Sequence, residues 1–438
     1  MERILITGGT VLTMTGPDAV YEGGLVAIED GRIAYAGPAQ AAPAEVRAPG
    51  WAQRTIEATG RLVLPGLVNT HTHAAMVLLR GYADDMRLME WLETKIWPVE
   101  ANLTAEDVYW GTALACLESL LAGVTTFNDM YFFMADAARA VADTGARAVL
   151  SRGIIGSGED FRSRLADAWD FYRAWHGKAD GRVLTMLAPH APYTVAPPEL
   201  EKVAEAAAEM GVGIHIHLVE TRDEVELLRQ RYGKTAFEII RDAGLTRHPV
   251  VGAHCVHPTD ADMEIFAAAG GRVAHCPVSN LKLACGVAPI LAWRRAGVPV
   301  GLGTDGAASA NQMSLWGEIR LAALLQKNAS GDPRAFTAYD AVHAATAGGA
   351  RVLGLEDRIG TLEPGKRADL ILVDARRPGL TPVHDPFSIL AYSTNPGDVE
   401  TVLVDGRVVV EDRRLTTMDA AEITAKAAEH ARRLVGAA

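Results

Sequence analysis

Short hydrophobic runs and helix-type repeats alternate along the middle of the chain. The runs have the length of buried strands, and they occur at eight places: residues 62–68, 124–128, 146–150, 183–188, 213–218, 250–253, 272–275 and 299–303. Helical patterns separate most of them, and the clearest predicts a helix over residues 105–122 with Thr104 as its cap and Gly123 at its end. Eight strands that alternate with helices predict an α/β fold built as a (β/α)8 barrel.

The two ends of the chain carry a different, all-β pattern. Near the N-terminus, the hairpin signal Asp30-Gly31 lies among strand-like runs at residues 4–7, 10–14, 25–29 and 32–37. Near the C-terminus, Asp405-Gly406 lies among similar runs at residues 369–374, 400–404 and 407–410. We therefore expect one small β-sandwich domain from residues 1–60 and 360–438, closed by a helix over 419–434, and a catalytic barrel domain over residues 61–359.

Composition and charge narrow the class of protein. Of 438 residues, 49% are hydrophobic, which excludes wholesale disorder. The net charge of −12 repels phosphate backbones and anionic lipid, so we expect neither nucleic acid nor a membrane as a partner. The N-terminus does not have the pattern of a signal peptide. Four scattered cysteines without a C-x-x-C pair are typical of reduced thiols, so we expect a cytoplasmic protein.

Residue types that bind metal ions follow four of the eight runs. Barrel enzymes carry their chemistry at these strand ends. In strand order the residues are His71 and His73, His215 and His217, His254, and Asp305. Side chains two apart on an extended segment point the same way, so each H-x-H pair can face one point. Three imidazoles, one carboxylate and a water make an open catalytic site for zinc or ferrous iron.

The sequence does not decide between His215 and His217 as a metal ligand, but the positions of the lysines indicate how many ions bind. His215 and His217 lie on the same side of their strand, so alternation does not choose between them. Barrels that hold two metal ions bridge them with a carboxylated lysine at a strand end. The fourth run ends at His190, and the lysines nearest to it are Lys178 before the run and Lys202 in the next helix. We therefore expect a single divalent ion.

Several motifs resemble those of a known family. LPGLVNTHTH (64–73), the strand ends with His217, His254 and Asp305, and GTLEPGKRADL (360–370) resemble the amidohydrolase superfamily. More narrowly, five further segments are similar to 5-methylthioadenosine/S-adenosylhomocysteine deaminases: LMEWL (88–92), IWPVE (96–100), APHAPY (188–193), HLVET (217–221) and HCPVSNLKL (275–283). These motifs span nearly the whole chain and occur in the family's order.

The resemblance implies a reaction and a metal site. The reaction is hydrolytic deamination at C6 of adenine nucleosides that carry a 5′-thioether, 5′-methylthioadenosine and/or S-adenosylhomocysteine, giving the inosine analogues and ammonia. The resemblance chooses His217 over His215 and implies one divalent ion held by His71, His73, His217 and Asp305. Zinc is the expected metal, and the same ligands accept iron or manganese. Members of the family are often dimers or tetramers, and the sequence does not decide the oligomeric state.

The resemblance further implies roles for three catalytic residues. Glu220 would protonate the purine at N1 and pass the proton onward. His254 would hold the attacking oxygen and stabilise the charge that grows at C6. Asp305 would take the proton of the attacking water as well as bind the metal. Ser279 and Asn280, beyond the seventh strand, are expected to order loops around the pocket.

Substrate contacts are implied in the same way. Glu100 would accept hydrogen bonds from the 2′- and 3′-hydroxyls of ribose, and His190 would contact ribose or purine. Arginine suits the carboxylate at the far end of S-adenosylhomocysteine. The residues for that end are Arg152 and Arg164, with Arg162 as an alternative to Arg164. An apolar wall over the substrate would comprise Trp97, Trp91 and Leu92.

Other interpretations remain open at this stage. Glu220 could pair with Arg222, Glu100 and the arginines could form surface ion pairs, and the histidines and tryptophans could be ordinary core residues. The alternative activities are those of a guanine deaminase or a triazine dechlorinase, and the non-enzymatic alternative is a scaffold on the same fold. Glu100 distinguishes a nucleoside deaminase from these two alternative enzymes, because a bare base or a triazine has no vicinal diol for this residue to bind. The sequence does not rank methylthioadenosine, S-adenosylhomocysteine, adenosine and 5′-deoxyadenosine.

Overall fold

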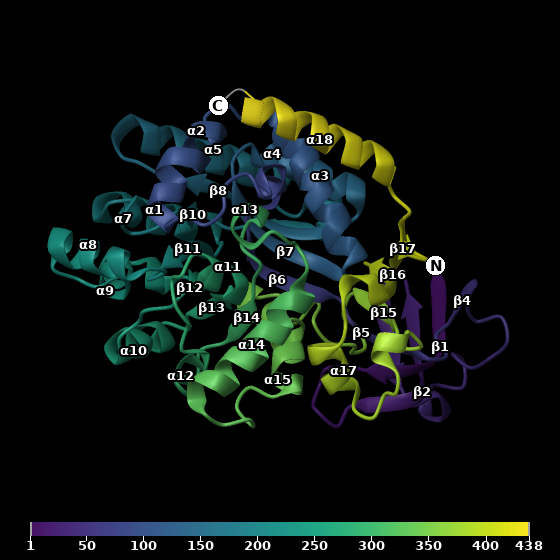
Figure 1. Ribbon diagram of the computed structural model, residues 1–438. Coiled ribbons are helices and arrows are strands. Elements are labelled where there is room, and N and C mark those ends of the chain that lie inside the picture. The colour runs from purple at the N-terminus through teal and green to yellow at the C-terminus, as the bar shows by residue number, and fades with distance from the viewer. Residues whose placement is uncertain (1, 437–438) are drawn as a thin grey trace.

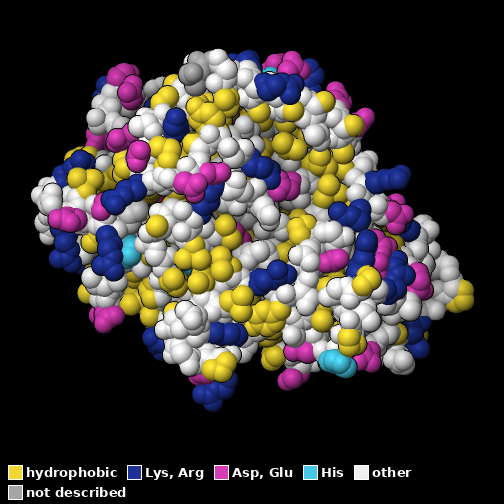
Figure 2. Space-filling model, viewed as in Figure 1, with side chains coloured by type: hydrophobic (Ala, Val, Ile, Leu, Met, Phe, Trp, Pro, Cys, Tyr) yellow, Lys and Arg dark blue, Asp and Glu magenta, His cyan; other side chains and the backbone are white. Residues whose placement is uncertain are grey.

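The computed structural model describes residues 2–436, which fold into a sheet built from both chain ends and a larger α/β body (Figure 1). The purple N-terminal strands and the yellow C-terminal strands lie side by side in the figure, next to the teal and green body. On the face shown in Figure 2, positive and negative side chains are interspersed. Within residues 2–436, no helix is both long and apolar enough to cross a membrane.

Nine strands form the sheet that joins the two ends of the chain. In chain order they are β1 (Arg3–Leu12), β2 (Val20–Glu29), β3 (Arg32–Gly37), β4 (Arg54–Glu57), β5 (Arg61–Pro65), β15 (Leu370–Asp374), β16 (Val399–Val404), β17 (Arg407–Glu411) and β18 (Arg414–Leu415). Their order is β18-β17-β16-β15-β5-β1-β2-β3, with β4 also paired to β1. The two ends meet where β5 pairs with β1 in parallel and with β15 antiparallel. The expectation that strands from both ends of the chain pair with each other is confirmed.

Two hairpin turns of this sheet follow the sequence signal. Asp30 and Gly31 have φ of 49° and 75°, and Asp405 and Gly406 have φ of 54° and 75°. Two consecutive positive φ angles are what a tight two-residue hairpin needs, and Asp-Gly adopts them at low cost. The turns also touch each other, because a Cβ atom added at Gly406 would lie 2.6 Å from Gly31 Cα. Both glycines are therefore required for space as well as for conformation.

The α/β body contains two parallel sheets. The first comprises β6 (Leu67–Thr72), β7 (Val124–Tyr131), β8 (Arg147–Ile154), β9 (Val183–Thr185) and β10 (Ala188–Pro189), and the second comprises β11 (Ile214–Leu218), β12 (Val250–His254), β13 (Arg272–His275) and β14 (Val300–Leu302). A parallel bridge between Leu187 and Ile214 links them on one side. On the other side, the Asp305 N–H donates to the His71 carbonyl at 3.0 Å. The strand ends that carry the predicted ligands therefore come together.

Two of the eight expected strands are divided. The run over residues 62–68 is split at Gly66, so that β5 joins the composite sheet and only β6 joins the body. A Cβ atom at Gly66 would lie 2.2 Å from Thr125 Oγ1, so this crossing point has no room for a side chain. The run over 183–188 divides into β9 and β10 because the backbone changes partner, with Met186 N–H bonded to Leu150 and Leu187 N–H to Gly213. Both changes depend on neighbouring strands, which a local pattern does not reveal.

Helices cover the outside of the body (Figure 1). The predicted helix over 105–122 is α3 (Ala105–Leu121), where Thr104 and Asp107 form a capping box. The expected closing helix is α18 (Ala420–Gly436), which packs along α3. The others are α1 (Leu88–Trp91), α2 (Trp97–Glu100), α4 (Met134–Thr144), α5 (Gly158–Trp175), α6 (Lys178–Gly181), α7 (Pro197–Met210), α8 (Arg222–Tyr232), α9 (Ala236–Asp242), α10 (Asp260–Ala268), α11 (Pro277–Lys282), α12 (Ile290–Arg295), α13 (Ala307–Ala310), α14 (Leu315–Ser330), α15 (Ala338–Ala344), α16 (Ala347–Leu353) and α17 (Pro386–Tyr392).

Candidate active site

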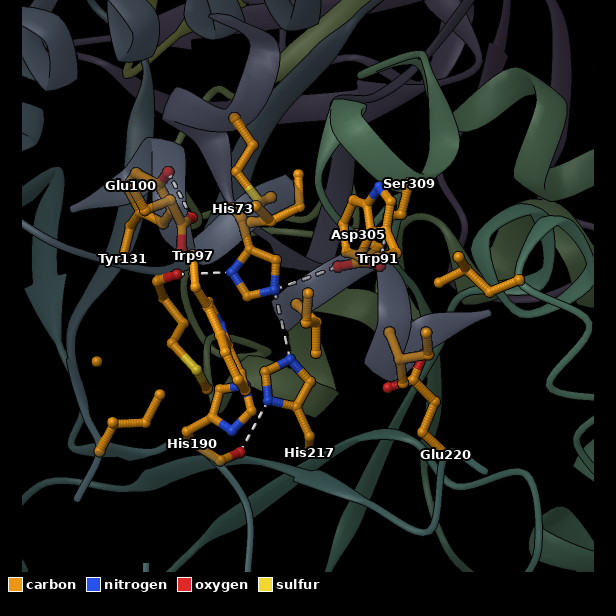
Figure 3. A pocket seen from close by; sticks show the side chains of 18 of the residues that line it. His73, Trp91, Trp97, Glu100, Tyr131, His190, His217, Glu220, Asp305 and Ser309 are labelled. Carbon is orange, nitrogen blue, oxygen red and sulfur yellow. Dashed lines mark hydrogen bonds and ion pairs between the residues drawn. The ribbon is translucent and has the colours of Figure 1, made fainter. Parts of the chain in front are cut away.

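A pocket lies where the strands of the α/β body end, and it collects most of the residues singled out from the sequence. Figure 3 shows Glu220 and Asp305 on one side of it and Glu100 and His190 on the other. Its lining includes His73, Trp91, Leu92, Trp97, Glu100, Tyr131, His190, His217, Glu220, His254 and Asp305. Parallel strands bring their carboxyl ends to one edge, which explains how residues far apart in sequence meet here.

The four predicted metal ligands form one compact cluster. Potential ligand atoms of His71, His73 and His217 lie within 4.8 Å of one another, and so do those of His71, His254 and Asp305. Asp305 Oδ1 lies 3.3 Å from His71 Nε2 and 3.2 Å from His73 Nε2. The Nε2 atoms of His73 and His217 are 3.4 Å apart. The donor atoms of three imidazoles and one carboxylate thus converge on one point.

The cluster has the features of a metal-binding site. Nδ1 of His73 donates to the Met130 carbonyl at 2.7 Å, and Nδ1 of His217 donates to the His190 carbonyl at 2.8 Å. These bonds place the ring hydrogen on Nδ1 and leave the Nε2 lone pair facing the cluster, as in histidines that ligate metals. The buried Nε2 of His71 makes no hydrogen bond. A divalent ion fits this donor set and would satisfy that atom.

Electrostatics in the cluster also suit a cation. Burial lowers the pKa of His71 to about 3 and that of His217 well below its usual value, so both rings are neutral, as ligands must be. Burial acts to lower the pKa of His73 as well, but the Asp305 carboxylate outweighs burial and raises it to about 9, so a metal ion that binds Nε2 of His73 would displace a proton from that atom. Burial acts to raise the pKa of Asp305, yet the neighbouring rings of His71 and His73 hold it well below normal. The carboxylate is therefore ionised and attracts positive charge.

His215 lies behind the cluster rather than in it. The ring is fully buried, and its Nε2 lies 2.8 Å from His71 Nδ1, on the side of His71 that faces away from Asp305. His217 therefore presents the second imidazole of this strand to the pocket. Alternation along the strand placed both rings on one side but did not give their distance from His71, because that distance depends on how separate strands align.

Serine hydroxyls and an asparagine hold the reactive groups from behind. Ser279 and Ser309 donate to Asp305 Oδ2 at 2.7 and 2.6 Å, which directs Oδ1 toward the histidines. Asn280 Oδ1 lies 2.8 Å from His254 Nδ1. The expectation that Ser279 and Asn280 order the pocket agrees with these contacts. Ser309 was not expected; it lies in α13, shortly after Asp305, and the turn between them brings its hydroxyl back to the carboxylate.

Glu220 faces His254 across the edge of the pocket. Its Oε2 lies 3.8 Å from His254 Nε2, and its Oε1 accepts a hydrogen bond from the Cys285 thiol at 3.6 Å. Arg222, the alternative partner, has an exposed side chain on α8. Burial raises the pKa of Glu220. A carboxyl group with a raised pKa in a pocket is suited to exchange protons near neutral pH.

Glu100 and His190 lie on the opposite side of the pocket from Glu220. Glu100, at the end of α2, accepts a hydrogen bond from Tyr131 Oη at 2.7 Å, and burial raises its pKa to about 7. His190 Nδ1 lies 2.9 Å from Thr194 Oγ1. Trp97 lines the same pocket. Tyr131 is a contact that the sequence patterns did not indicate, because it lies beyond the run predicted over 124–128, at the end of the longer strand β7.

The predicted arginines line a second cavity next to the pocket. This cavity has a volume of about 900 Å³ and includes Arg152 and Arg164. It shares Trp97 and Glu100 with the first pocket, so the two cavities adjoin. Arg162 instead forms an exposed ion pair with Glu159. Of the two alternatives, Arg164 is thus the arginine that faces the cavity.

Comparison with known proteins gives a consistent picture along the full length of the chain. The pattern of the amidohydrolase family matches residues 62–409. The chain is 58% identical to the 5-methylthioadenosine/S-adenosylhomocysteine deaminase of Symbiobacterium thermophilum, over 99% of this chain and 100% of that protein.

Solved structures of other proteins also resemble this chain along nearly its full length. An adenosine deaminase from Xanthomonas campestris with bound zinc superposes with a TM-score of 0.93 at 37% identity, covering 98% of each chain. An atrazine chlorohydrolase from Arthrobacter aurescens complexed with zinc gives a TM-score of 0.90 at 27% identity, over 98% of this chain and 100% of that one.

Proposed function

The chain belongs to the amidohydrolase family and, within it, to the 5-methylthioadenosine/S-adenosylhomocysteine deaminases, and from this premise we propose that it removes the 6-amino group of these nucleosides by hydrolysis. The products are the corresponding inosine analogues and ammonia. The observation that carries the proposal is that one pocket holds a metal-binding cluster, a buried acid at Glu220 and a second carboxyl group at Glu100.

The metal would be held by His71, His73, His217 and Asp305. Zinc is the proposed ion, since two structurally similar relatives contain it and imidazole with carboxylate suits it. A bound divalent ion lowers the pKa of water to about 7 and so supplies a nucleophile at neutral pH.

The chain's own residues then move the protons. Asp305 Oδ1 takes one proton from the water that attacks C6, while Glu220 gives a proton to N1 of the ring. His254, held by Asn280, orients the attacking oxygen and stabilises charge that grows at C6. The C6–N bond breaks as the amine leaves with the proton taken by Asp305, and the remaining hydroxyl proton returns to Glu220. Water is consumed, ammonia is released and both carboxyl groups are restored.

The rest of the pocket would hold the nucleoside. Glu100 accepts hydrogen bonds from the ribose 2′- and 3′-hydroxyls, and His190 contacts ribose or purine. Trp97, with Trp91 and Leu92, packs against the apolar faces of the substrate. Because Arg152 and Arg164 line the adjoining cavity, they are placed to bind the carboxylate of S-adenosylhomocysteine. This arrangement supports a pocket that accepts the 5′-thioether substituent.

We also infer the finer architecture from the family. The two parallel sheets would be halves of one (β/α)8 barrel over residues 61–359, linked through Leu187–Ile214 and through Asp305–His71. The composite sheet would fold over as a small β-sandwich from residues 1–60 and 360–438. Crossing of the chain at Gly66, between β5 and β6, supports a domain border close to this point.

A triazine hydrolase activity is the second candidate, and the similarity to atrazine chlorohydrolase favours considering it. The Glu100 carboxyl, half-buried in the pocket lining, argues for a nucleoside instead, because a triazine offers no vicinal hydroxyls to it. The test is a panel of methylthioadenosine, S-adenosylhomocysteine, adenosine, 5′-deoxyadenosine, guanine and atrazine, with ammonia and chloride measured. Ammonia from the adenine nucleosides supports the proposal. Turnover confined to guanine or atrazine contradicts it.

A further inference from the structure

Glu224 is a buried carboxyl group that the proposed chemistry does not use. It lies in the first turn of α8, which follows β11 in the body (Figure 1), and its side chain is only 5% exposed. We propose that Glu224 is a positioning residue that holds the turn Val219–Glu220 and thereby aims the Glu220 carboxyl at the purine. This assignment rests on the proposed function, since it concerns how the proton-transferring group is held.

The turn in question is strained. Val219, between the last residue of β11 and Glu220, has a φ of 46°. The left-handed region is costly for any residue with a Cβ atom, and a β-branched side chain makes it a genuine outlier. Such a conformation persists only where its surroundings hold it. Because the strained residue directly precedes Glu220, whatever holds it also sets the direction of the Glu220 side chain.

Glu224 supplies much of that restraint. The Val219 N–H donates to Glu224 Oε1 at 3.0 Å, and the Glu220 N–H donates to Glu224 Oε2 at 2.9 Å. From the other side, the Val219 carbonyl accepts from the N–H groups of Val256 and His257 at 3.2 and 3.0 Å. The turn is therefore fixed between the start of α8 and the loop after β12.

A neighbouring helix shows that this is not an ordinary helix cap. In α9, Thr235 caps the helix and Glu238, three residues on, bonds back to the Thr235 N–H to complete a capping box. The same T-x-x-E pattern begins α8, with Thr221 as the cap. There the acid at the third position binds the two N–H groups that precede the cap. The side chain of Glu224 thus serves the Val219–Glu220 turn in place of its own helix.

This arrangement explains why a glutamate occupies a buried position. Both oxygens of the carboxyl group are needed, since each accepts a different backbone N–H. A glutamine has one oxygen, so its NH2 group would face one of the two donors. The turn would then relax, and a displacement of about 1 Å at a reacting group can cost roughly 100-fold in rate.

The test compares Glu224→Gln with Glu238→Gln, its counterpart in α9. We expect Glu224→Gln to lower kcat on methylthioadenosine roughly 10- to 100-fold, with KM and metal content little changed. Glu238→Gln should leave kcat as in the wild type, because one glutamine oxygen still accepts the single Thr235 N–H that Glu238 binds. Equal kcat values for the two variants would overturn the assignment.

A double variant separates positioning from folding. Glycine adopts positive φ freely, so Val219→Gly should make Glu224 dispensable. We expect Val219→Gly combined with Glu224→Gln to recover most of the kcat that Glu224→Gln loses. The double variant also provides folded protein if Glu224→Gln alone does not fold. A double variant no faster than Glu224→Gln, or far slower than Val219→Gly alone, overturns the assignment. Wild-type protein that leaves methylthioadenosine intact would instead overturn the proposed function itself, and the assignment with it.

Discussion

Several reactive side chains stand on, or next to, residues with left-handed backbone. His254 and Asp305 have φ of 68° and 62°, and Val219, with φ of 46°, precedes Glu220. Outside glycine such angles are uncommon, and they cluster at functional sites, where surrounding contacts hold them. Here they turn the chain sharply at three strand ends. The side chains are thereby directed across the pocket instead of along the strands.

Glu220 is the residue whose substitution tests the proton transfer. Glu220→Gln keeps the shape of the side chain but removes its proton, so we expect kcat to fall roughly 10²- to 10⁴-fold. Metal content, measured by elemental analysis, should not change, because Glu220 is outside the predicted ligand set. Glu226→Gln, at an exposed position on α8, is the control. Near-normal turnover by Glu220→Gln would remove this residue from the mechanism.

Glu100 gives the site a pH dependence of defined sign. Burial raises its pKa to about 7, so the carboxyl gains a proton below that pH and loses capacity to accept from the ribose hydroxyls. We expect kcat/KM for nucleosides to fall as the pH drops through 7. The Tyr131 hydroxyl stabilises the charged form, so Tyr131→Phe should raise the pKa and move this limb to higher pH. The measurement is the pH profile of kcat/KM for wild type and Tyr131→Phe. If the fall at low pH occurs at the same pH in both proteins, or shifts equally with free adenine as substrate, Glu100 does not bind ribose.

For single residues, the sequence predicts which side chains belong to the site better than it predicts which side chains they contact. His71, His73 and Asp305 were identifiable because each follows an apolar run, and strand ends share one edge. His217 was chosen over His215 only through the resemblance to the family. The position of His215 behind His71, the bond of Ser309 to Asp305 and that of Tyr131 to Glu100 were not identifiable. The contacts of His215 and Tyr131 join separate strands or helices, so they depend on strand register and loop paths. Ser309 is local to Asp305, and its bond depends on the turn that leads from β14 into α13.

Elements with local signals match their predictions closely. The strand over 32–37 has the expected bounds in β3, and α3 begins after Thr104 as its cap indicates. Hairpins at Asp30-Gly31 and Asp405-Gly406 need only the conformational freedom of two residues. The run over 62–68 was misread because its division between two sheets is decided at Gly66 by the neighbouring Thr125. An apolar run alone does not say which sheet it enters.

The cap of α3 should contribute measurably to stability. Thr104 accepts from the Asp107 N–H, and Asp107 in turn accepts from both the N–H and the hydroxyl of Thr104. Thr104→Ala removes one side of this box, so we expect a loss of about 1 kcal/mol in the free energy of unfolding. Thr424→Ala, inside α18, is the control, because its hydroxyl only bonds back to Ala420. Denaturant unfolding measures both, and equal losses would contradict the capping role.

In the molecule as a whole, a buried ion cluster ties the α/β body to the composite sheet. Arg147, at the start of β8, donates to both oxygens of Asp369 at 2.7 and 3.0 Å and to Asp405 at 3.1 Å. Asp369 immediately precedes β15, and Asp405 is in the hairpin between β16 and β17. The guanidinium and the Asp369 carboxylate are almost fully buried. Breaking such a pair leaves an uncompensated charge in the interior.

Asp369→Ala should therefore destabilise the protein strongly. We expect the free energy of unfolding to fall by about 3–5 kcal/mol, since buried Arg147 would lose its main partner. Asp180 and Arg407 form an exposed ion pair between the same two parts of the chain. Arg407→Ala is the matched control and should cost at most about 1 kcal/mol. Similar small losses for both variants, in denaturant unfolding, would show that the buried cluster does not hold the parts together.

The most direct measurement is titration of the metal-depleted protein with zinc while methylthioadenosine turnover is followed by ammonia release. The four convergent ligands predict that activity is absent without metal and rises in proportion to zinc until one ion is bound per chain. The product should be the inosine analogue. Full turnover without metal, a requirement for two ions per chain, or unchanged methylthioadenosine at full occupancy would contradict the account.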